Sequence, residues 1–343
     1  MNIVFRVDAY PETGLGHFVR SLDIAINLKK TVRCNVFFTG KYSENAMASL
    51  RQSQLPFLNH EISEEEKIII ENAIQSWNPS LVFMDTLFPY SSSFIKELKK
   101  KTSVVLFHNL CEGRFDADAF ILPSAHHSPE IINDIRWKEN SVEFYHGFEY
   151  ILLNERLKLI KPRRKKTRET PVVSITTGGS DPRGILLKVL EWINYPEFEN
   201  ISFKAMPGEA FIKRKELEVL TSNLGENITI EKFNYETLAE SDLVISTFGV
   251  TSYELIYLGV PVISISHAEM NANGSKILTE KISGFIDLGL IDHLTETRFR
   301  ESLNQVLSNK KLSEEFRNIT AGLIDGKGTS RIINIISGII EKN

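Results

Sequence analysis

The chain has 343 residues, of which 42% are hydrophobic and 24% charged, and its formal net charge is -4. This length predicts two domains of roughly 150 to 180 residues each, and the composition is that of a globular enzyme and not of a disordered or fibrous protein. The small net charge gives no electrostatic reason to expect nucleic acid as a partner.

The first half of the sequence alternates short β-branched or aromatic runs with helical patterns. Strands are expected at residues 2–7, 35–40, 56–62, 81–85, 103–109 and 119–124, and helices at about 16–30, 43–52, 64–77 and 92–101. The first run is interpreted as a strand and not as a signal peptide, because Arg6 and Asp8 interrupt it. Repeated βα units predict a parallel sheet with helices on both faces.

The alternation stops at residues 154–171, which are charged and bracketed by prolines, and then restarts. Further strands are expected at 171–179, 201–206, 227–233, 242–249 and 260–266, and helices within 313–342. We therefore expect two Rossmann-like domains, residues 1–155 and 170–325, that face each other across a cleft, and a final helix at 326–343 that packs back on the first domain. The basic run 161–168 is expected to be a solvated linker and not a site for a polyanion or a membrane.

No stretch of about 18 apolar residues occurs, so we expect no transmembrane segment. Cys34 and Cys111 lie among apolar residues and lack the spacing of metal ligands, which predicts a reduced, cytoplasmic protein. The histidines His126, His127 and His146 have no acidic partners at metal-ligand spacing and are expected to have packing or surface roles. We expect neither a metal nor any other cofactor.

The segment TGLGHFVRS places two glycines just before a histidine, directly after the first strand. Gly14 and Gly16 would let the backbone turn tightly and approach a ligand. His17 falls in the first turn of the next helix, and an imidazole with an ordinary pKa near 6.5 suits a base at cellular pH. Two interpretations stay open from the residues alone: His17 acts on a substrate, or it merely caps or packs the start of the helix.

Two segments of the second half place glycine or hydroxyl residues at the end of a strand. Gly178, Gly179 and Ser180 follow the strand at 171–179 and either offer backbone N–H groups to a ligand or form an ordinary turn. In STFGVTSYELIYLGVPVISIS, Gly249 opens a turn before a helix whose first N–H groups suit a diphosphate. Glu254 stands three residues after Thr251, a spacing that fits a helix cap as well as a ribose-binding acid.

Four segments in the same order resemble the PseG family of UDP-sugar hydrolases, which act in pseudaminic acid synthesis and are related to the MurG-type glycosyltransferases. These segments are FRVDAYPETGLGHFVRSLDIA, YHGFEYILLNERL, VVSITTGGSDPRG and STFGVTSYELIYLGVPVISI. The resemblance covers roughly residues 1 to 290. It implies an α/β chain with the GT-B fold, in which two Rossmann-like domains face a cleft and the C-terminal one holds the nucleotide.

The resemblance also implies an activity and a set of site residues. Water would attack the anomeric carbon of a UDP-linked, acetamido-substituted deoxyhexose without a metal, and His17 would activate that water. Substrate contacts are expected from Asp8, Gly14, Gly16, Arg20, Asp85, Asn109 and Asn271. Nucleotide contacts are expected from Gly178, Gly179, Ser180, Phe233, Ser246, Gly249, Val250, Thr251, Ser252 and Glu254. The partner would be this UDP-sugar, in a pathway of glycan or nonulosonic acid synthesis.

The sequence departs from the family at three places near the expected sugar site. At residues 108–113, HNLCEG replaces the acidic residues that the family often has after the strand at 103–109. Leu87 stands where the family has a tyrosine, with Tyr90 three residues later, and Met270 and Asn271 stand nearest to an Asn-Gln pair of the family. Two other functions therefore stay open. The protein could be a glycosyltransferase whose histidine deprotonates an acceptor hydroxyl, or a nucleotide-sugar binding protein without catalytic activity.

Overall fold

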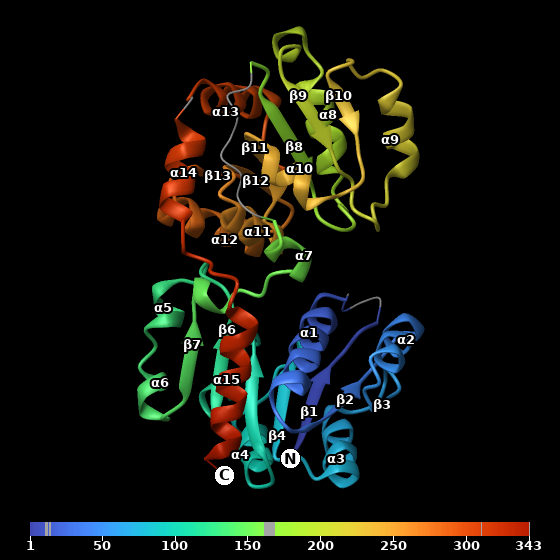
Figure 1. Ribbon diagram of the computed structural model, residues 1–343, viewed down its shortest axis with the longest axis vertical. Helices are drawn as coiled ribbons and strands as arrows, with labels where there is room; N and C mark the ends of the chain where they lie inside the picture. The colour runs from blue at the N-terminus through green and yellow to red at the C-terminus, as the bar shows by residue number, and fades with distance from the viewer. Residues whose placement is uncertain (11–12, 14, 161–168, 310, 343) are drawn as a thin grey trace. The chain divides into compact units, whose positions relative to one another are not determined.

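The computed structural model describes residues 1–343 except 11–12, 14, 161–168, 310 and 343, and the chain divides into two compact units (Figure 1). Unit 1 comprises Met1–Ala125, Pro129–Leu152 and Gly326–Asn343. Unit 2 comprises His126–Ser128 and Leu153–Asp325. The basic run 161–168, expected to be a linker, lies outside the described residues.

Unit 1 contains a parallel sheet whose described strands have the order β3-β2-β1-β4-β5-β6-β7. The strands are β1 (Asn2–Val7), β2 (Asn35–Gly40), β3 (Phe57–Asn59), β4 (Leu81–Asp85), β5 (Ser103–Phe107), β6 (Ala119–Leu122) and β7 (Glu143–His146). The helices are α1 (Gly16–Thr31), α2 (Glu44–Gln52), α3 (Glu66–Trp77), α4 (Ser92–Lys99), α5 (Pro129–Ile132), α6 (Arg136–Glu139) and α15 (Gly328–Glu341), with short 3-10 turns at Glu112–Phe115 and Phe148–Tyr150.

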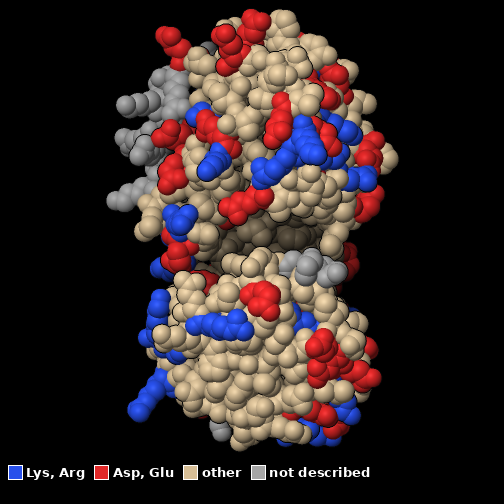
Figure 2. Space-filling view, turned by 90° about the vertical axis from the view of Figure 1, so that its right-hand side faces the viewer, with Lys and Arg blue, Asp and Glu red and all other residues tan. Residues whose placement is uncertain are grey.

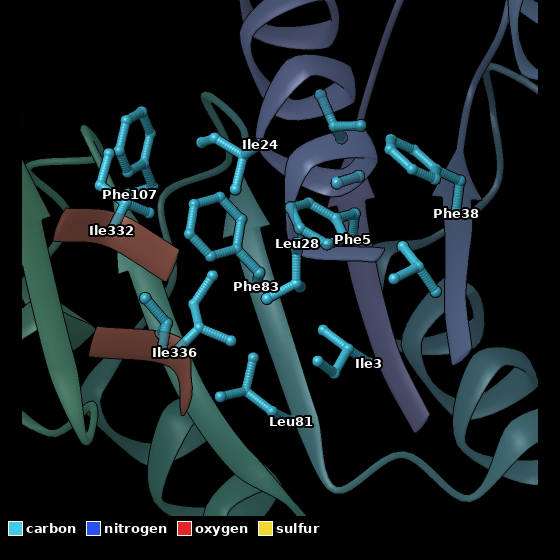
Figure 3. Close-up of a cluster of buried hydrophobic side chains, with 14 of the residues drawn as sticks. Ile3, Phe5, Ile24, Leu28, Phe38, Leu81, Phe83, Phe107, Ile332 and Ile336 are labelled. Carbon is cyan, nitrogen blue, oxygen red and sulfur yellow. The ribbon is translucent and has the colours of Figure 1, made fainter. Parts of the chain in front are cut away.

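Helices cover both faces of this sheet because successive strand residues point to opposite sides. Ile3 and Phe5 of β1 pack in one cluster with side chains of α1, α2 and α15, whereas Val4 packs in a second cluster with α3 and α4. Figure 3 shows the first cluster, in which Ile332 and Ile336 of α15 meet side chains from the sheet and α1. The last helix of the chain is thus part of the core of unit 1.

Unit 2 repeats this architecture with strands in the order β10-β9-β8-β11-β12-β13 among its described residues. They are β8 (Val172–Thr176), β9 (Ser202–Ala205), β10 (Ile228–Ile230), β11 (Leu243–Thr247), β12 (Val262–Ser266) and β13 (Phe285–Leu290). The helices are α7 (Glu155–Lys158), α8 (Ile185–Ile193), α9 (Arg214–Thr221), α10 (Tyr235–Glu240), α11 (Val250–Leu258), α12 (Glu269–Lys281), α13 (Glu296–Ser308) and α14 (Leu312–Thr320), with a 3-10 turn at Pro196–Phe198.

The expected α/β class with two Rossmann-like sheets is confirmed, and each expected strand and helix of both halves is found within a few residues. Two strands were missed. Residues of β7 are all half-buried at the sheet edge, so they lack an alternating apolar pattern. In β13, Asp287 and Gly289 interrupt the apolar run, and the pairing with β12 is irregular at the same place.

The strand orders define where a ligand would bind in each unit. In unit 1 the chain order reverses between β1 and β4, and in unit 2 it reverses between β8 and β11. At such a point the loops that leave the two neighbouring strands run to opposite faces and leave a crevice at the carboxyl ends. We therefore expect ligands to bind at the segments after β1 and β8 and at the carboxyl ends of β4 and β11.

The charged side chains of the surface shown in Figure 2 are mixed in sign, and the described helices are too short or too polar to cross a membrane. In Figure 2, Lys and Arg side chains lie interspersed with Asp and Glu on the face shown, and no broad surface of one sign is visible there. Among the described residues, no helix combines the length and the apolar composition that a membrane span requires.

His126 belongs to unit 2 and packs beneath its α11 region. Its ring lies at right angles to Phe248, with 4.9 Å between centroids, and Nδ1 is hydrogen-bonded to the Tyr253 hydroxyl. Burial, with smaller contributions from His127 and Lys281, lowers the pKa of His126 to about 3. The packing role expected for this histidine is what the structure shows.

His126 should make the protein sensitive to mild acid. The unfolded chain protonates this ring near pH 6.5 and the folded chain near pH 3, so its stabilising contribution is present above pH 6.5 and is lost as the pH falls. Between pH 6.5 and 5 we expect a loss of about 2 kcal/mol that His126→Phe does not show. Denaturant unfolding of both proteins at the two pH values measures it, and equal losses would contradict the assignment.

Candidate functional site

The candidate site of unit 1 is formed by the start of α1 and the end of β4. Gly16 is the first residue of α1 and His17 the second, as expected from the sequence. The His17 Nδ1 atom lies 2.6 Å from Oδ1 of Asp85, the last residue of β4. The histidine and the aspartate thus meet across the point where the strand order of unit 1 reverses.

Asp85 is fully buried, and three side chains hydrogen-bond to its carboxylate. Arg20 donates from Nε at 2.6 Å and from Nη2 at 2.5 Å, and Ser21 donates from its hydroxyl at 3.1 Å. Burial alone would raise the pKa of Asp85, but the charge and hydrogen bonds of Arg20, together with His17, outweigh it and lower that pKa. The carboxylate is therefore ionised at neutral pH.

This ionised carboxylate determines which nitrogen of His17 carries the proton. An oxygen 2.6 Å from Nδ1 requires a proton on that nitrogen, because two lone pairs at this distance would repel. Arg20 Nη2 also lies 2.9 Å from Nδ1, but it is nearer, at 2.5 Å, to the aspartate oxygen that accepts its proton. In the neutral form of this imidazole, Nε2 is then the unprotonated nitrogen and is able to accept a proton.

Asp8 follows β1 and is held by a buried ionic network. Arg6 lies fully buried between Asp8 and Glu66, with donor–acceptor distances of 2.6 and 3.0 Å to Asp8 and 2.6 and 2.9 Å to Glu66. The Asp8 Oδ1 atom also accepts the Lys41 backbone N–H at 2.9 Å. Since 15% of the Asp8 side chain remains exposed, it can still meet a ligand.

Two further residues expected at the sugar site, Asp85 and Asn109, are buried. Asp85 has no exposed surface, so it positions His17 and Arg20 and does not itself contact a substrate. Asn109 is also buried: its amide donates to the Phe88 carbonyl at 2.7 Å and accepts from the Cys111 N–H at 3.0 Å, which ties two loops together. The burial of these two side chains was not visible in the sequence, and a contact of Asn109 with a substrate stays a prediction. Gly14 lies outside the described residues.

The candidate site of unit 2 is a cavity of about 370 Å³ at the carboxyl ends of β8 and β11. Its lining is formed by Thr177, Gly178, Gly179, Ser180, Asp181, Pro182, Thr247, Phe248, Gly249, Val250, Thr251 and His267. The loop of Gly178 and Gly179 and the turn at Gly249, which are about 70 positions apart in the sequence, therefore line the same cavity. Thr177 is buried, and its hydroxyl has no hydrogen-bond partner among the residues that the structure describes, which suits a polar ligand.

The start of α11 forms one wall of this cavity. Gly249 is the N-cap, and its N–H donates to the Ser252 hydroxyl at 3.3 Å. Val250 and Thr251 are the first two helical residues, and N–H groups in that first turn have no partner within the helix. Together with the helix dipole they favour an anion such as a phosphate.

On the opposite side of the cavity, Asp181 fixes the glycine loop. Its two carboxylate oxygens accept the N–H groups of Ile185 and Leu186, at 2.9 and 2.8 Å, at the start of α8. Gly178 has φ of +77° within this loop, a conformation that favours glycine. The loop is thus tied to the helix that follows it, and its backbone is held in place before any ligand binds.

Glu254 lies on α11 and is almost fully buried. Its Oε1 accepts the Tyr235 hydroxyl at 2.7 Å, and burial raises its pKa although the hydroxyls of Tyr235 and Thr251 act in the opposite direction. Glu254 thus does contact the Thr251 hydroxyl, but this contact is not the helix cap, because Gly249 and Ser252 form the cap and Thr251 lies inside the helix.

The other residues expected to contact the nucleotide do not line the cavity. Ser246 is buried in β11 and donates to the Thr247 carbonyl. Ser252 is also fully buried and serves the helix cap. Neither lines the cavity, and their contacts with a nucleotide stay predictions. Phe233 is 38% exposed and lies edge-on to Tyr235, outside the cavity lining. Asn271 on α12 donates to the Phe248 carbonyl at 3.1 Å and so supports a loop of the cavity.

Six residues of the cavity lining were not identified from the sequence: Thr177, Asp181, Pro182, Thr247, Phe248 and His267. They lie at the carboxyl end of β8, β11 or β12 or in the loop that follows β8, and ligands of such sheets bind at those ends. Counting every residue at the carboxyl end of an expected strand and in the loop after it would have included them. Among the described residues, no group of three or more His, Cys, Asp or Glu side chains is placed to hold a metal ion.

A cavity of about 530 Å³ lies elsewhere, in unit 1, and is lined by Met1, Pro79, Ser80, Lys99, Lys101, Thr102, Ser103, Asp118 and Ile340. It is larger than the cavity of unit 2, but it lies at the amino ends of β4 and β5. Ligands of parallel sheets bind at the carboxyl ends, where the loops diverge. We therefore assign the candidate site to the smaller cavity and the His17 region.

Gly249 allows the cavity to be tested without disturbing the fold. Its φ of 170° is extended, and a Cβ there would meet no protein atom within 4 Å. Gly249→Ala should change the free energy of unfolding by no more than about 0.5 kcal/mol, yet its methyl group would occupy the space in front of the first N–H groups of α11. We expect nucleotide affinity, measured by calorimetry, to fall by about 10- to 100-fold.

Gly338 in α15 is the matched control, because a Cβ there also meets no atom within 4 Å and the residue belongs to unit 1. Gly338→Ala should leave nucleotide affinity unchanged. Wild-type affinity in Gly249→Ala would show that no ligand group lies in front of α11.

Comparison with curated proteins finds two relatives, and no family model matches the chain. One is the spore coat polysaccharide biosynthesis protein SpsG of Bacillus subtilis, which is 23% identical over 100% of this chain and 99% of its own length. The other is the uncharacterized protein MJ1062 of Methanocaldococcus jannaschii, 24% identical over 95% of this chain and 70% of its own.

Solved structures are similar over nearly the whole chain. MurG of Acinetobacter baumannii has a TM-score of 0.71 with 12% identity, and covers 98% of this chain and 99% of its own. The UDP-GlcNAc 2-epimerase of Neisseria meningitidis, solved with UDP-GlcNAc, has a TM-score of 0.65 with 14% identity over 100% of both chains. Identities this low show the fold alone. The chain has the two parallel-sheet, Rossmann-like domains of the GT-B fold.

Proposed function

We propose that the protein is a nucleotide-sugar hydrolase that releases UDP from a UDP-linked acetamido-deoxyhexose, with His17 activating the attacking water. The single observation that carries the proposal is the buried hydrogen bond between Asp85 and His17 Nδ1, which leaves Nε2 to accept a proton. A histidine oriented by a buried carboxylate is the arrangement used for general-base catalysis.

The cavity of unit 2 supports the proposal that the protein binds the UDP group of the substrate. The diphosphate would lie against the first turn of α11 and the loop of Gly178 and Gly179, where backbone N–H groups are already in place. When the bond between sugar and phosphate breaks, negative charge grows on the UDP oxygen, and fixed dipoles stabilise that charge without reorganising. Glu254 of α11, held by the hydroxyl of Tyr235 from α10, would accept the ribose hydroxyls.

The relatives support the substrate class and suggest a setting. The similar epimerase structure contains UDP-GlcNAc, and SpsG acts, by its name, in polysaccharide biosynthesis. A role in the synthesis of a surface glycan or a nonulosonic acid of the pseudaminic type fits both. The free thiols of Cys34 and Cys111 fit a reducing compartment, so we propose that the enzyme acts in the cytoplasm.

Transfer to an acceptor is the second candidate, because several of the similar structures are glycosyltransferases. In that reaction Nε2 of His17 would take the proton of an acceptor hydroxyl instead of a water molecule. The chemistry at the leaving group is the same in both reactions. The two differ only in the oxygen that attacks the sugar.

Incubation with UDP-sugars in ¹⁸O-labelled water separates these functions. Free sugar carrying the label, with one UDP per sugar, is the result expected for hydrolysis at the anomeric carbon. A donor that stays intact until an acceptor is added would overturn hydrolysis in favour of transfer. Thermal stabilisation by a panel of UDP-sugars with no turnover, with and without acceptors, would instead indicate a binding protein.

A further inference from the structure

A second histidine lies beside His17 in unit 1, at the end of the neighbouring strand. His108 directly follows β5, which pairs with β4, the strand that ends in Asp85. The ring centroids of His17 and His108 are 6.5 Å apart, with 59° between the ring planes. Its side chain is half-buried and therefore partly accessible to solvent. Two imidazoles thus occupy the carboxyl edge of the sheet at the candidate site.

The backbone at His108 is in an unusual conformation. Its φ is +58°, in the left-handed region that glycine or asparagine adopts more readily than a residue with a ring. The N–H of His108 donates to the Ile121 carbonyl at 2.8 Å, so the conformation is held by the adjacent strand β6. Backbone strain that the surrounding structure holds in place is concentrated at functional sites.

The distance between the two rings fits one oxygen atom bound by both. A ring centroid lies about 4 Å from an oxygen that is hydrogen-bonded to one of its nitrogens. Two rings bound to one oxygen at a tetrahedral angle would then have centroids about 6.5 Å apart, which is the separation found for His17 and His108. Direct contact between the nitrogens would require a shorter distance.

We propose that His108 holds the attacking water together with His17 and so selects water over an alcohol. This inference rests on the proposed hydrolysis. Nε2 of His17 accepts the proton that leaves the water, and an unprotonated nitrogen of His108 accepts a hydrogen bond from the second O–H. One lone pair of the water oxygen forms the new bond to the anomeric carbon, while the electrons of the sugar–phosphate bond pass to the UDP oxygen. An alcohol has one O–H group and cannot satisfy both acceptors.

Two substitutions distinguish the effect of the His108 side chain from the effect of its backbone conformation. His108→Gly removes the ring and relieves the left-handed strain, so the variant should be as stable as the parent or more stable. His108→Asn keeps a residue tolerated at positive φ and supplies an amide oxygen that accepts a hydrogen bond. Ser141, exposed and with φ of +54°, is the matched control for a glycine at positive φ away from the site.

The experiment measures UDP release and the products formed from a UDP-sugar in buffer that contains methanol. We expect His108→Gly to hydrolyse about 10-fold or more slowly and to raise the ratio of methyl glycoside to free sugar, with nucleotide affinity unchanged. His108→Asn should lie between this variant and the parent, and Ser141→Gly should equal the parent. A His108→Gly protein with the parental rate and product ratio would overturn the role of His108 alone. A parent that releases no free sugar would overturn the proposed hydrolysis and this role with it.

Discussion

Replacing His17 with glutamine is expected to lower turnover of the UDP-sugar by about 10² to 10⁴-fold, the contribution of a positioned general base. Glutamine can still hydrogen-bond to Asp85, but it cannot take a proton from water. The cavity of unit 2 is not changed by the substitution, so nucleotide affinity should equal that of the parent. Steady-state UDP release and calorimetric titration with UDP measure the two quantities.

The exposed His293 of unit 2 offers a matched control, since its side chain lies outside the described cavity lining. His293→Gln should leave both turnover and affinity unaltered. Hydrolysis by the His17→Gln protein at the parental rate would remove His17 from the mechanism. A weakened affinity for UDP with normal turnover at saturation would instead assign His17 to binding.

Asp85→Asn is expected to reduce both activity and stability. An asparagine amide that donates to Nδ1 would move the imidazole proton to Nε2, so the base is lost and turnover falls by about 10² to 10⁴-fold. The change also leaves Arg20 without its buried counter-charge. Because the Arg20 side chain is 21% exposed and can reach water, we expect the free energy of unfolding to fall by about 2 to 4 kcal/mol.

The loss of stability in Asp85→Asn is expected to depend on pH. Asp85 has a lowered pKa in the folded protein, so its stabilising contribution is complete above the unfolded pKa of about 3.9 and is lost as the pH falls through the folded pKa. The asparagine variant should therefore lose less stability than the parent on acidification below about pH 4. Denaturant unfolding across this range measures the difference.

Ser21→Ala is the control for Asp85→Asn, because it removes one hydrogen bond to Asp85 Oδ2 and keeps the carboxylate with its charge. We expect it to destabilise the protein by only about 1 kcal/mol and to keep most of the activity. An Asp85→Asn protein with parental turnover would show that the orientation of His17 does not depend on this carboxylate.

The sequence by itself determined the fold class and the regions where ligands would bind. Short β-branched or aromatic runs, separated by helical patterns, predicted the parallel sheets, since alternating strands and helices bury each strand between two layers of helices. Glycine and hydroxyl residues after strands indicated the 178–180 and 249–252 segments, which the structure brings into one cavity. Edge strand β7 and the interrupted strand β13 were missed because packing, and not local pattern, makes them strands.

Only the tertiary structure decided which polar side chains face a ligand. Asp85, Asn109 and Ser246 follow or end strands as a site residue would, yet burial turns them toward the protein. The pairing of His17 with Asp85, and its proximity to His108, depends on segments more than 60 positions apart along the chain. Sheet order sets such distances, because neighbouring parallel strands bring the ends of distant segments to one edge.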